Sequence, residues 1–185
     1  MRVFFASTRS LQIAIASGLA MASIAGNASA QSTRYIPPEL PAAQETPSNI
    51  IRLQKEAEKA LQRGVEALQS GDYVTAEQNF ETVLEFDPDN ENVNYFMALA
   101  KIGNNNKQEA TKYLKTAIKS NSNFFAARET LALVSVELGD YPEAIKQRDA
   151  LRAQRDKCTE NSCADLGKLN LAVAKVESAL RAAAQ

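Results

Sequence analysis

Two cysteines, Cys158 and Cys163, are the residues of this sequence best suited to chemistry of their own. The 185-residue chain contains no histidine, so Ser-His-Asp and Cys-His catalysis lack their general base. Two cysteines alone also cannot build a Cys/His zinc site. The pair encloses Thr-Glu-Asn-Ser, which differs from the Cys-x-x-Cys spacing of redox enzymes. We therefore expect a structural disulfide, with a redox-active pair as the alternative.

A bond between these cysteines constrains the chain around them. In one continuous helix their Cα atoms would lie about 8 Å apart, at a rise of about 1.5 Å per residue, which is too far to bridge. The bond thus predicts a break between the helix before it and the helix after it. Closing so short a loop is worth about 2 kcal/mol in the chain-entropy description. We expect it to fasten a C-terminal helix to the rest of the fold.

The remaining charged groups offer weaker candidates. Glu85, Asp87, Asp89 and Glu91 form an acidic turn, but it lacks the glycine and the spacing of a calcium loop and is more typical of a helix end. The sequence has no glycine-rich phosphate loop and no G-x-S-x-G element. Its 21 basic and 22 acidic residues argue against nucleic-acid binding. We expect no metal, no cofactor and no enzymatic activity; a carboxylate-based hydrolase is a third hypothesis.

The first 30 residues have the features of an export signal. Arg2 and Arg9 precede an apolar run at 11–25, and the segment ends in Asn-Ala-Ser-Ala. This pattern is typical of a secretory signal peptide, and the run falls short of the roughly 20 residues of a spanning helix. We expect cleavage after Ala30 and a periplasmic or secreted protein, with an uncleaved anchor as the alternative.

Residues 31–47 contain four prolines and predict an extended linker. Thr46 and Pro47 at its end suit the N-cap and first residue of a helix. A spacer is the simpler interpretation of this segment, and a partner-binding tail anchored by Tyr35 is the alternative.

The rest of the chain repeats itself. Gly71-Asp72-Tyr73 and Ala76 recur 68 residues later, and Ala76, Ala110 and Ala144 lie 34 residues apart without a gap. A fixed period of this length is the signature of a repeat architecture.

This pattern resembles the tetratricopeptide repeat. The resemblance implies an all-α fold: a right-handed superhelix of three antiparallel helix pairs at 57–90, 91–124 and 125–158, within a repeat region of 48–158. A capping helix would follow within 159–185, where Leu166, Leu169, Val173, Val176 and Leu180 share one helix face. The sequence departs from the family where a bulky apolar residue is expected at Arg148, and where Ala60, Asn94 and Arg128 replace an aromatic residue.

Small residues at the helix crossings would let paired helices approach closely, and bulky ones would fill the space between repeats. The predicted packing residues are Gly64, Ala76, Phe80, Ala98, Ala110, Leu114, Ala132 and Ala144. Because no single pair buries its own face, stability would come from stacking.

In the resembling family, the first helices line a concave groove that holds a polypeptide. The groove positions here are Leu61, Val65, Leu68, Tyr95, Leu99, Ile102, Glu129, Leu133 and Val136. A subclass grips a peptide carboxylate with Lys and Asn, but the matching positions are Leu61, Val65, Phe96, Ala126 and Thr130. The sequence therefore favours a scaffold that binds an apolar or helical polypeptide of the cell envelope. The alternatives are a groove filled by the chain's own core, linker or cap, and a structural module that self-associates into a homo-oligomer.

Overall fold

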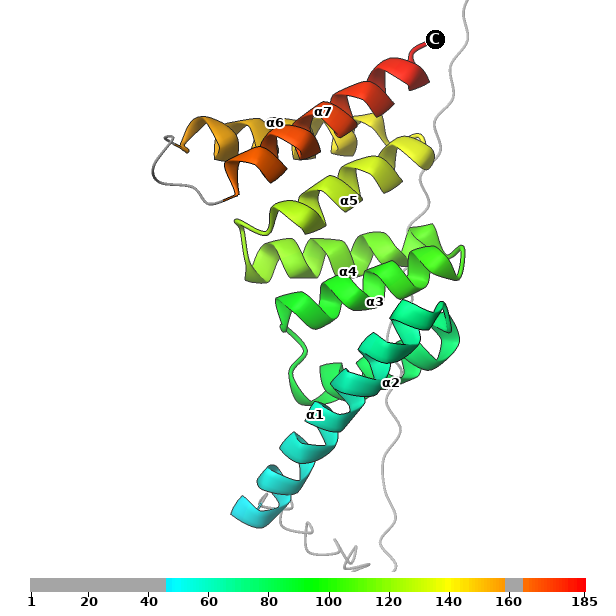
Figure 1. Cartoon of the computed structure of the whole chain (residues 1–185), viewed down its shortest axis with the longest axis vertical. Helices are drawn as coiled ribbons and strands as arrows, with labels where there is room; N and C mark the ends of the chain where they lie inside the picture. Colours follow the sequence, from blue (N-terminus) through cyan, green and yellow to red (C-terminus); the bar gives the residue numbers. More distant parts are fainter. Residues whose placement is uncertain (1–45, 159–164) are drawn as a thin grey trace, which may run out of the picture. The chain divides into compact units, whose positions relative to one another are not determined.

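The computed structural model describes residues 46–158 and 165–185, all within one compact unit, 44–185. These residues form seven α-helices and no strand (Figure 1). The helices are α1 (Pro47–Ser70), α2 (Tyr73–Phe86), α3 (Glu91–Gly103), α4 (Lys107–Ser120), α5 (Phe125–Glu137), α6 (Tyr141–Asp156) and α7 (Leu166–Ala183). The expected all-α solenoid of three helix pairs and a C-terminal helix is confirmed. The predicted signal peptide, residues 31–45 of the predicted linker, and Cys163 lie outside the described residues.

Each helix pairs with its neighbour along the chain. α1 packs on α2, α3 on α4 and α5 on α6, while α3 also contacts α2 and α5 contacts α4. α7 packs on both α5 and α6. In Figure 1, α3 lies in front of α4 and α7 in front of α6. The first helices and α7 therefore share one side of the stack, and the second helices share the other.

The turn inside each pair uses one geometry three times. Gly71, Asn105 and Gly139 lie 34 residues apart and all have positive φ, at 79°, 60° and 77°. This left-handed conformation suits glycine, and asparagine more than most other residues. The next residue in each turn caps the second helix: the side chains of Asp72, Asn106 and Asp140 accept hydrogen bonds from backbone N–H groups three residues on.

The turns between pairs are held by a side chain of the next helix. Asn94 Nδ2 donates to the carbonyl oxygens of Pro88 and Asn90, both at 2.9 Å. One repeat later, Arg128 Nη2 donates to the carbonyl of Ser122 at 2.9 Å. Asn94 and Arg128 are positions where the sequence departs from the family pattern. Each of these two polar side chains therefore donates a hydrogen bond to a backbone carbonyl of the preceding turn.

Three apolar clusters form the core, one in each part of the stack. All eight predicted packing residues are buried at helix contacts, and seven of them have no exposed surface. A Cβ atom on Gly64 would lie 2.6 Å from Cε1 of Phe80, so the aromatic ring occupies the space that glycine leaves. A Cβ on Gly103 would overlap the ring of Tyr73 in the same way. The contact of Phe80 with Gly64 closes the first helix pair, and the contact of Tyr73 with Gly103 joins this pair to the second one.

The two ends of the described region begin and close differently. α1 starts at Pro47, as predicted, but the Thr46 side chain makes no capping hydrogen bond.

α6 ends at Asp156 and α7 begins at Leu166, so a break between the last pair and the C-terminal helix is present. Cys158 is half-buried against the third cluster, while the disulfide to Cys163 stays a prediction. No helix of the described residues is long and apolar enough to cross a membrane.

Candidate functional site

The predicted groove residues lie on the three first helices, and we call them together the first-helix face. Every one of them is half-buried, neither sealed in the core nor fully exposed. Eight of the nine are apolar or aromatic. They are Leu61, Val65 and Leu68 on α1, Tyr95, Leu99 and Ile102 on α3, and Glu129, Leu133 and Val136 on α5.

The core supports this face from beneath. Leu61, Val65 and Leu68 pack against the first cluster, and Leu133 packs against the third. These side chains are packed on one side, and part of their surface stays accessible on the other. A partner would therefore meet a preformed apolar surface and lose little side-chain entropy on binding.

A row of aromatic rings crosses the middle of the face. The ring of Tyr95 lies 5.1 Å from that of Phe124 and 6.2 Å from that of Phe96, centroid to centroid. Phe96 in turn stacks on buried Phe80 at 5.8 Å. Aromatic contacts at such distances are favourable beyond their buried area. Tyr95 is therefore the most firmly supported large side chain of the face. The sequence analysis named Phe96 only as a position without a carboxylate-gripping side chain and did not name Phe124, although two adjacent aromatics at 95–96 were a signal.

The charged position of the face is already paired. Glu129 Oε1 accepts from Lys175 Nζ of α7 at 2.9 Å, with only 17% of the glutamate side chain exposed. Lys175 belongs to the predicted cap helix but was not among the predicted site residues. The pair ties α7 to α5 beside the apolar residues.

Lys101 lies between two residues of the face in sequence, but its charge turns toward the helices. Its Nζ lies 2.7 Å from Oε2 of Glu77 on α2 and 3.1 Å from Oε2 of Glu109 on α4. The hydrogen bond to Glu77 raises the pKa of Lys101 to about 12 against the opposing effect of burial. The same ammonium lowers the pKa of Glu109. This cation joins three helices and is not free to receive a ligand.

The acidic turn forms no cation site. Glu85, Asp87 and Asp89 are exposed, and an oxygen of Asp87 accepts from Asn90 Nδ2 at 3.0 Å. Within the described residues, no group of three or more His, Cys, Asp or Glu side chains could hold a metal ion.

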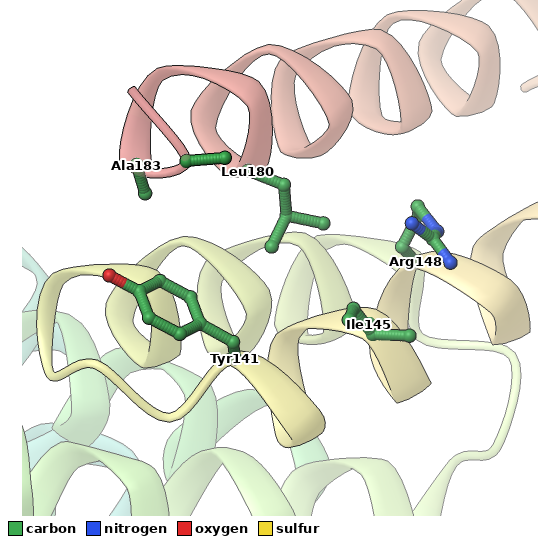
Figure 2. A pocket seen from close by; sticks show the side chains of 6 residues that line it. Tyr141, Ile145, Arg148, Leu180 and Ala183 are labelled. Carbon is green, nitrogen blue, oxygen red and sulfur yellow. The ribbon is translucent and has the colours of Figure 1, made fainter.

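A second apolar surface, absent from the sequence prediction, lies at the C-terminal end of the stack. It is a notch of about 240 Å³ between α6 and α7, lined by Tyr141, Ile145, Arg148, Leu180, Ala183 and Ala184. Figure 2 shows Leu180 of α7 and Tyr141 of α6 pointing into the space between the two helices. We call this site the end notch. Its one charged lining residue, Arg148, stands where the first two repeats carry Phe80 and Leu114.

Comparisons with known proteins point to one family. The tetratricopeptide repeat model matches residues 67–124. No curated protein matches the chain. The TPR2B domain of yeast Sti1, solved as a complex with pHsp70, aligns with a TM-score of 0.57 and 20% identity over 67% of this chain and 98% of that one.

Two further solved structures give the same fold. The TPR2AB domain of yeast Sti1, in a complex with pHSP90, has a TM-score of 0.58 and 19% identity, covering 70% of this chain and 50% of that one. The Sgt2 TPR domain from Aspergillus fumigatus has a TM-score of 0.52 and 22% identity, covering 68% and 82%.

Proposed function

Because the tetratricopeptide repeat model matches residues 67–124 and the fold is that of tetratricopeptide repeat domains, we propose that this chain is a protein-interaction module of that family and not an enzyme. The first-helix face binds a polypeptide partner. Two of the similar structures are complexes, one with pHsp70 and one with pHSP90, which supports a polypeptide as the class of ligand.

The observation that carries the proposal is the uniform half-burial of the first-helix face. Large apolar side chains that are packed on one side and open on the other supply the anchors of polypeptide recognition. A core position would be sealed, and a purely solvated face would be polar. These residues have neither property, and they recur at matching positions on α1, α3 and α5.

The chemistry of the face favours an apolar partner. Two lysines on or beside these helices, Lys101 and Lys175, are each bonded to carboxylates of this chain. The positions that grip a peptide carboxylate in part of the family are uncharged here, at Leu61, Val65, Phe96, Ala126 and Thr130. A partner helix or strand with an apolar stripe would contact Tyr95 and Leu99 and leave the charges at the rim in water.

We place this partner in the cell envelope on the strength of the N-terminal 30 residues, whose basic start, apolar run and small-residue end are typical of export. Mass spectrometry of the chain recovered from its own cells tests this step. A chain that begins at Gln31 supports export, and an intact N-terminus in the cytoplasmic fraction contradicts it.

Site-specific photo-crosslinking in living cells tests the binding face. A photoreactive residue replaces Leu99 on the first-helix face and, as the matched control, Val74, which is an exposed apolar residue of α2. We expect one defined partner to be captured from position 99 and not from position 74. Equal capture at both positions, or none at either, would refute the proposed face.

The partner captured from position 99 then allows a binding measurement. Leu99→Asp places an unpaired charge in an apolar contact and should weaken binding at least tenfold, whereas Val74→Asp should leave it unchanged. Circular dichroism establishes that both variants keep their helices. Unchanged binding by a folded Leu99→Asp chain would contradict the proposal.

A further inference from the structure

The end notch occupies the surface by which earlier repeats receive the next one. In the first repeat, Tyr73 covers Gly103 of α3, Glu77 binds Lys101 of α3 at 2.7 Å, and Phe80 stacks on Phe96 of α3 at 5.8 Å. These three positions of α2 form the docking surface for the following helix pair.

The same positions in the last repeat are only partly covered. They are Tyr141, Ile145 and Arg148, each 68 residues after its counterpart, and all three line the end notch. Tyr141 is 42% exposed and Ile145 40% exposed, although α7 packs on the rest of α6. Among the described residues, the C-terminal end thus keeps a partly uncovered docking surface, with Leu180 and Ala183 of α7 as its far wall (Figure 2).

The opposite end of the stack does not complement this surface. On α1, the positions equivalent to Phe96 and Gly103 hold Gln62 and Gln69, and both are exposed. Gln62 donates to Glu66 on the surface of the same helix. At these two positions the outer face of α1 is polar, as at the end of a repeat stack, although Ile50 and Ile51 near the start of the helix are exposed. The positions of α1 that correspond to Phe96 and Gly103 of α3 therefore offer no apolar match for the notch.

The charged residues of α6 and α7 that follow the notch in the two helices carry both signs of charge. Arg148 Nη2 lies 2.8 Å from Asp149 Oδ1, and Arg152 Nη2 lies 2.6 Å from Glu177 Oε1. Arg181 adds a further cation, 3.8 Å from the other oxygen of Glu177. A rim with both signs of charge can meet itself across a two-fold axis with acid opposite base, which is the requirement of a self-complementary interface.

We propose that a second copy of this chain covers the end notch, so that two molecules associate tail to tail through α6 and α7. The apolar centre of the contact is Tyr141, Ile145 and Leu180 of both copies, and the arginines and carboxylates form its rim. This goes beyond the proposed function, since the first-helix face takes no part and stays open in the dimer.

Light scattering coupled to size exclusion tests the proposal on the full chain, as recovered from cells that express the entire sequence. We expect a dimer that dissociates on dilution. Ile145→Glu should convert it to a monomer at every concentration, because a two-fold contact would bring a charged side chain from each copy into its apolar centre. Leu171→Glu, an exposed apolar residue of α7 that does not line the notch, should leave the dimer intact. Both sites are surface positions, and thermal unfolding checks that both variants fold.

Other outcomes would overturn the proposal. They are a monomer at the highest soluble concentration, a dimer that survives Ile145→Glu, or a mass that keeps rising with concentration, as head-to-tail stacking would require. Leu99→Asp separates this test from that of the proposed function, since it should weaken partner binding at least tenfold and leave the dimer unchanged.

Discussion

Equivalent repeat positions are buried at the junction between the first two repeats and partly exposed at the C-terminal end of the stack. At the junction, Phe80 is fully buried between Gly64 and Phe96. At the end, Arg148 holds the equivalent position and lines an open notch. In a stack, the burial of a second-helix position depends on the helix that packs over it from the next repeat. The residue type therefore reflects the neighbouring repeat rather than the helix itself.

The middle repeat extends the comparison. There the buried residue is Leu114, and its small partner is Ala98 in place of glycine. The larger ring of Phe80 requires the smaller residue Gly64, and the smaller Leu114 allows a methyl group. The two junctions reach full burial with different pairs of side chains, so volume is conserved across the pair and not at each position.

The largest predicted effect separates the junction from the end. Phe80→Ala removes a buried ring and should lower the free energy of unfolding by about 3–5 kcal/mol. Arg148→Ala, at the equivalent position, should cost less than about 1 kcal/mol, because its partner Asp149 is a solvated neighbour. Urea unfolding followed by circular dichroism, at dilutions where the chain is monomeric, measures both. Similar losses for the two variants would show that α7 buries the end as fully as α3 buries the junction.

A second prediction concerns replacing the Gly64–Phe80 pair by the Ala–Leu pair that the middle repeat has at the equivalent positions. Gly64→Ala alone should destabilise the chain by about 1–3 kcal/mol, because its methyl group collides with the Phe80 ring. The double variant Gly64→Ala/Phe80→Leu recreates the Ala98–Leu114 pair and should be more stable than the sum of its single changes by at least about 1 kcal/mol. The same unfolding assay yields this coupling energy. Strict additivity would mean that the two residues do not share one space.

The smallest predicted effect is a loss of folding stability at low pH, to which both regions contribute. Lys101 lowers the pKa of Glu109 at the junction, and Arg152 lowers that of Glu177 at the end, in both cases below the ordinary 4.5. A carboxylate with a lowered pKa in the folded state stabilises the fold above its unfolded pKa, and this contribution is lost as the pH falls through the folded value.

Unfolding free energies measured from about pH 7 down to about pH 3 should therefore decline below about pH 4.5. Glu109→Gln and Glu177→Gln should each make that decline shallower. A decline of unchanged slope in both variants would place the acid sensitivity elsewhere in the chain.

Much of the architecture could be predicted from spacing alone. The 34-residue interval between Ala76, Ala110 and Ala144 placed the second helices, and the structure gives the reason in the turns before them. A left-handed residue followed by a capping Asp or Asn recurs at the same interval. These are local requirements of the backbone, so a single sequence reveals them. The residues of the first-helix face likewise followed from helical register.

The features that could not be predicted depend on side chains meeting across the stack. Asn94 and Arg128 look like flaws in an apolar pattern, yet each bonds a turn carbonyl six residues earlier. Their equal spacing was a usable signal, but their partners are backbone atoms that a sequence pattern does not display. The end notch could not be predicted for another reason: α7 begins at Leu166 and does not keep the 34-residue interval between α3 and α5, so the repeat register does not say where α7 lies on α6.

The hydrogen bonds that Asn94 and Arg128 donate to the preceding turns limit how this protein can be truncated or recombined. A chain cut after residue 124 would keep the carbonyl of Ser122 but lose the guanidinium that binds it. A 34-residue repeat is thus not a complete unit for exchange between such proteins. The unit that can be exchanged is one repeat together with the first turn of the next helix. Neighbouring units therefore overlap in sequence and have to be transferred together.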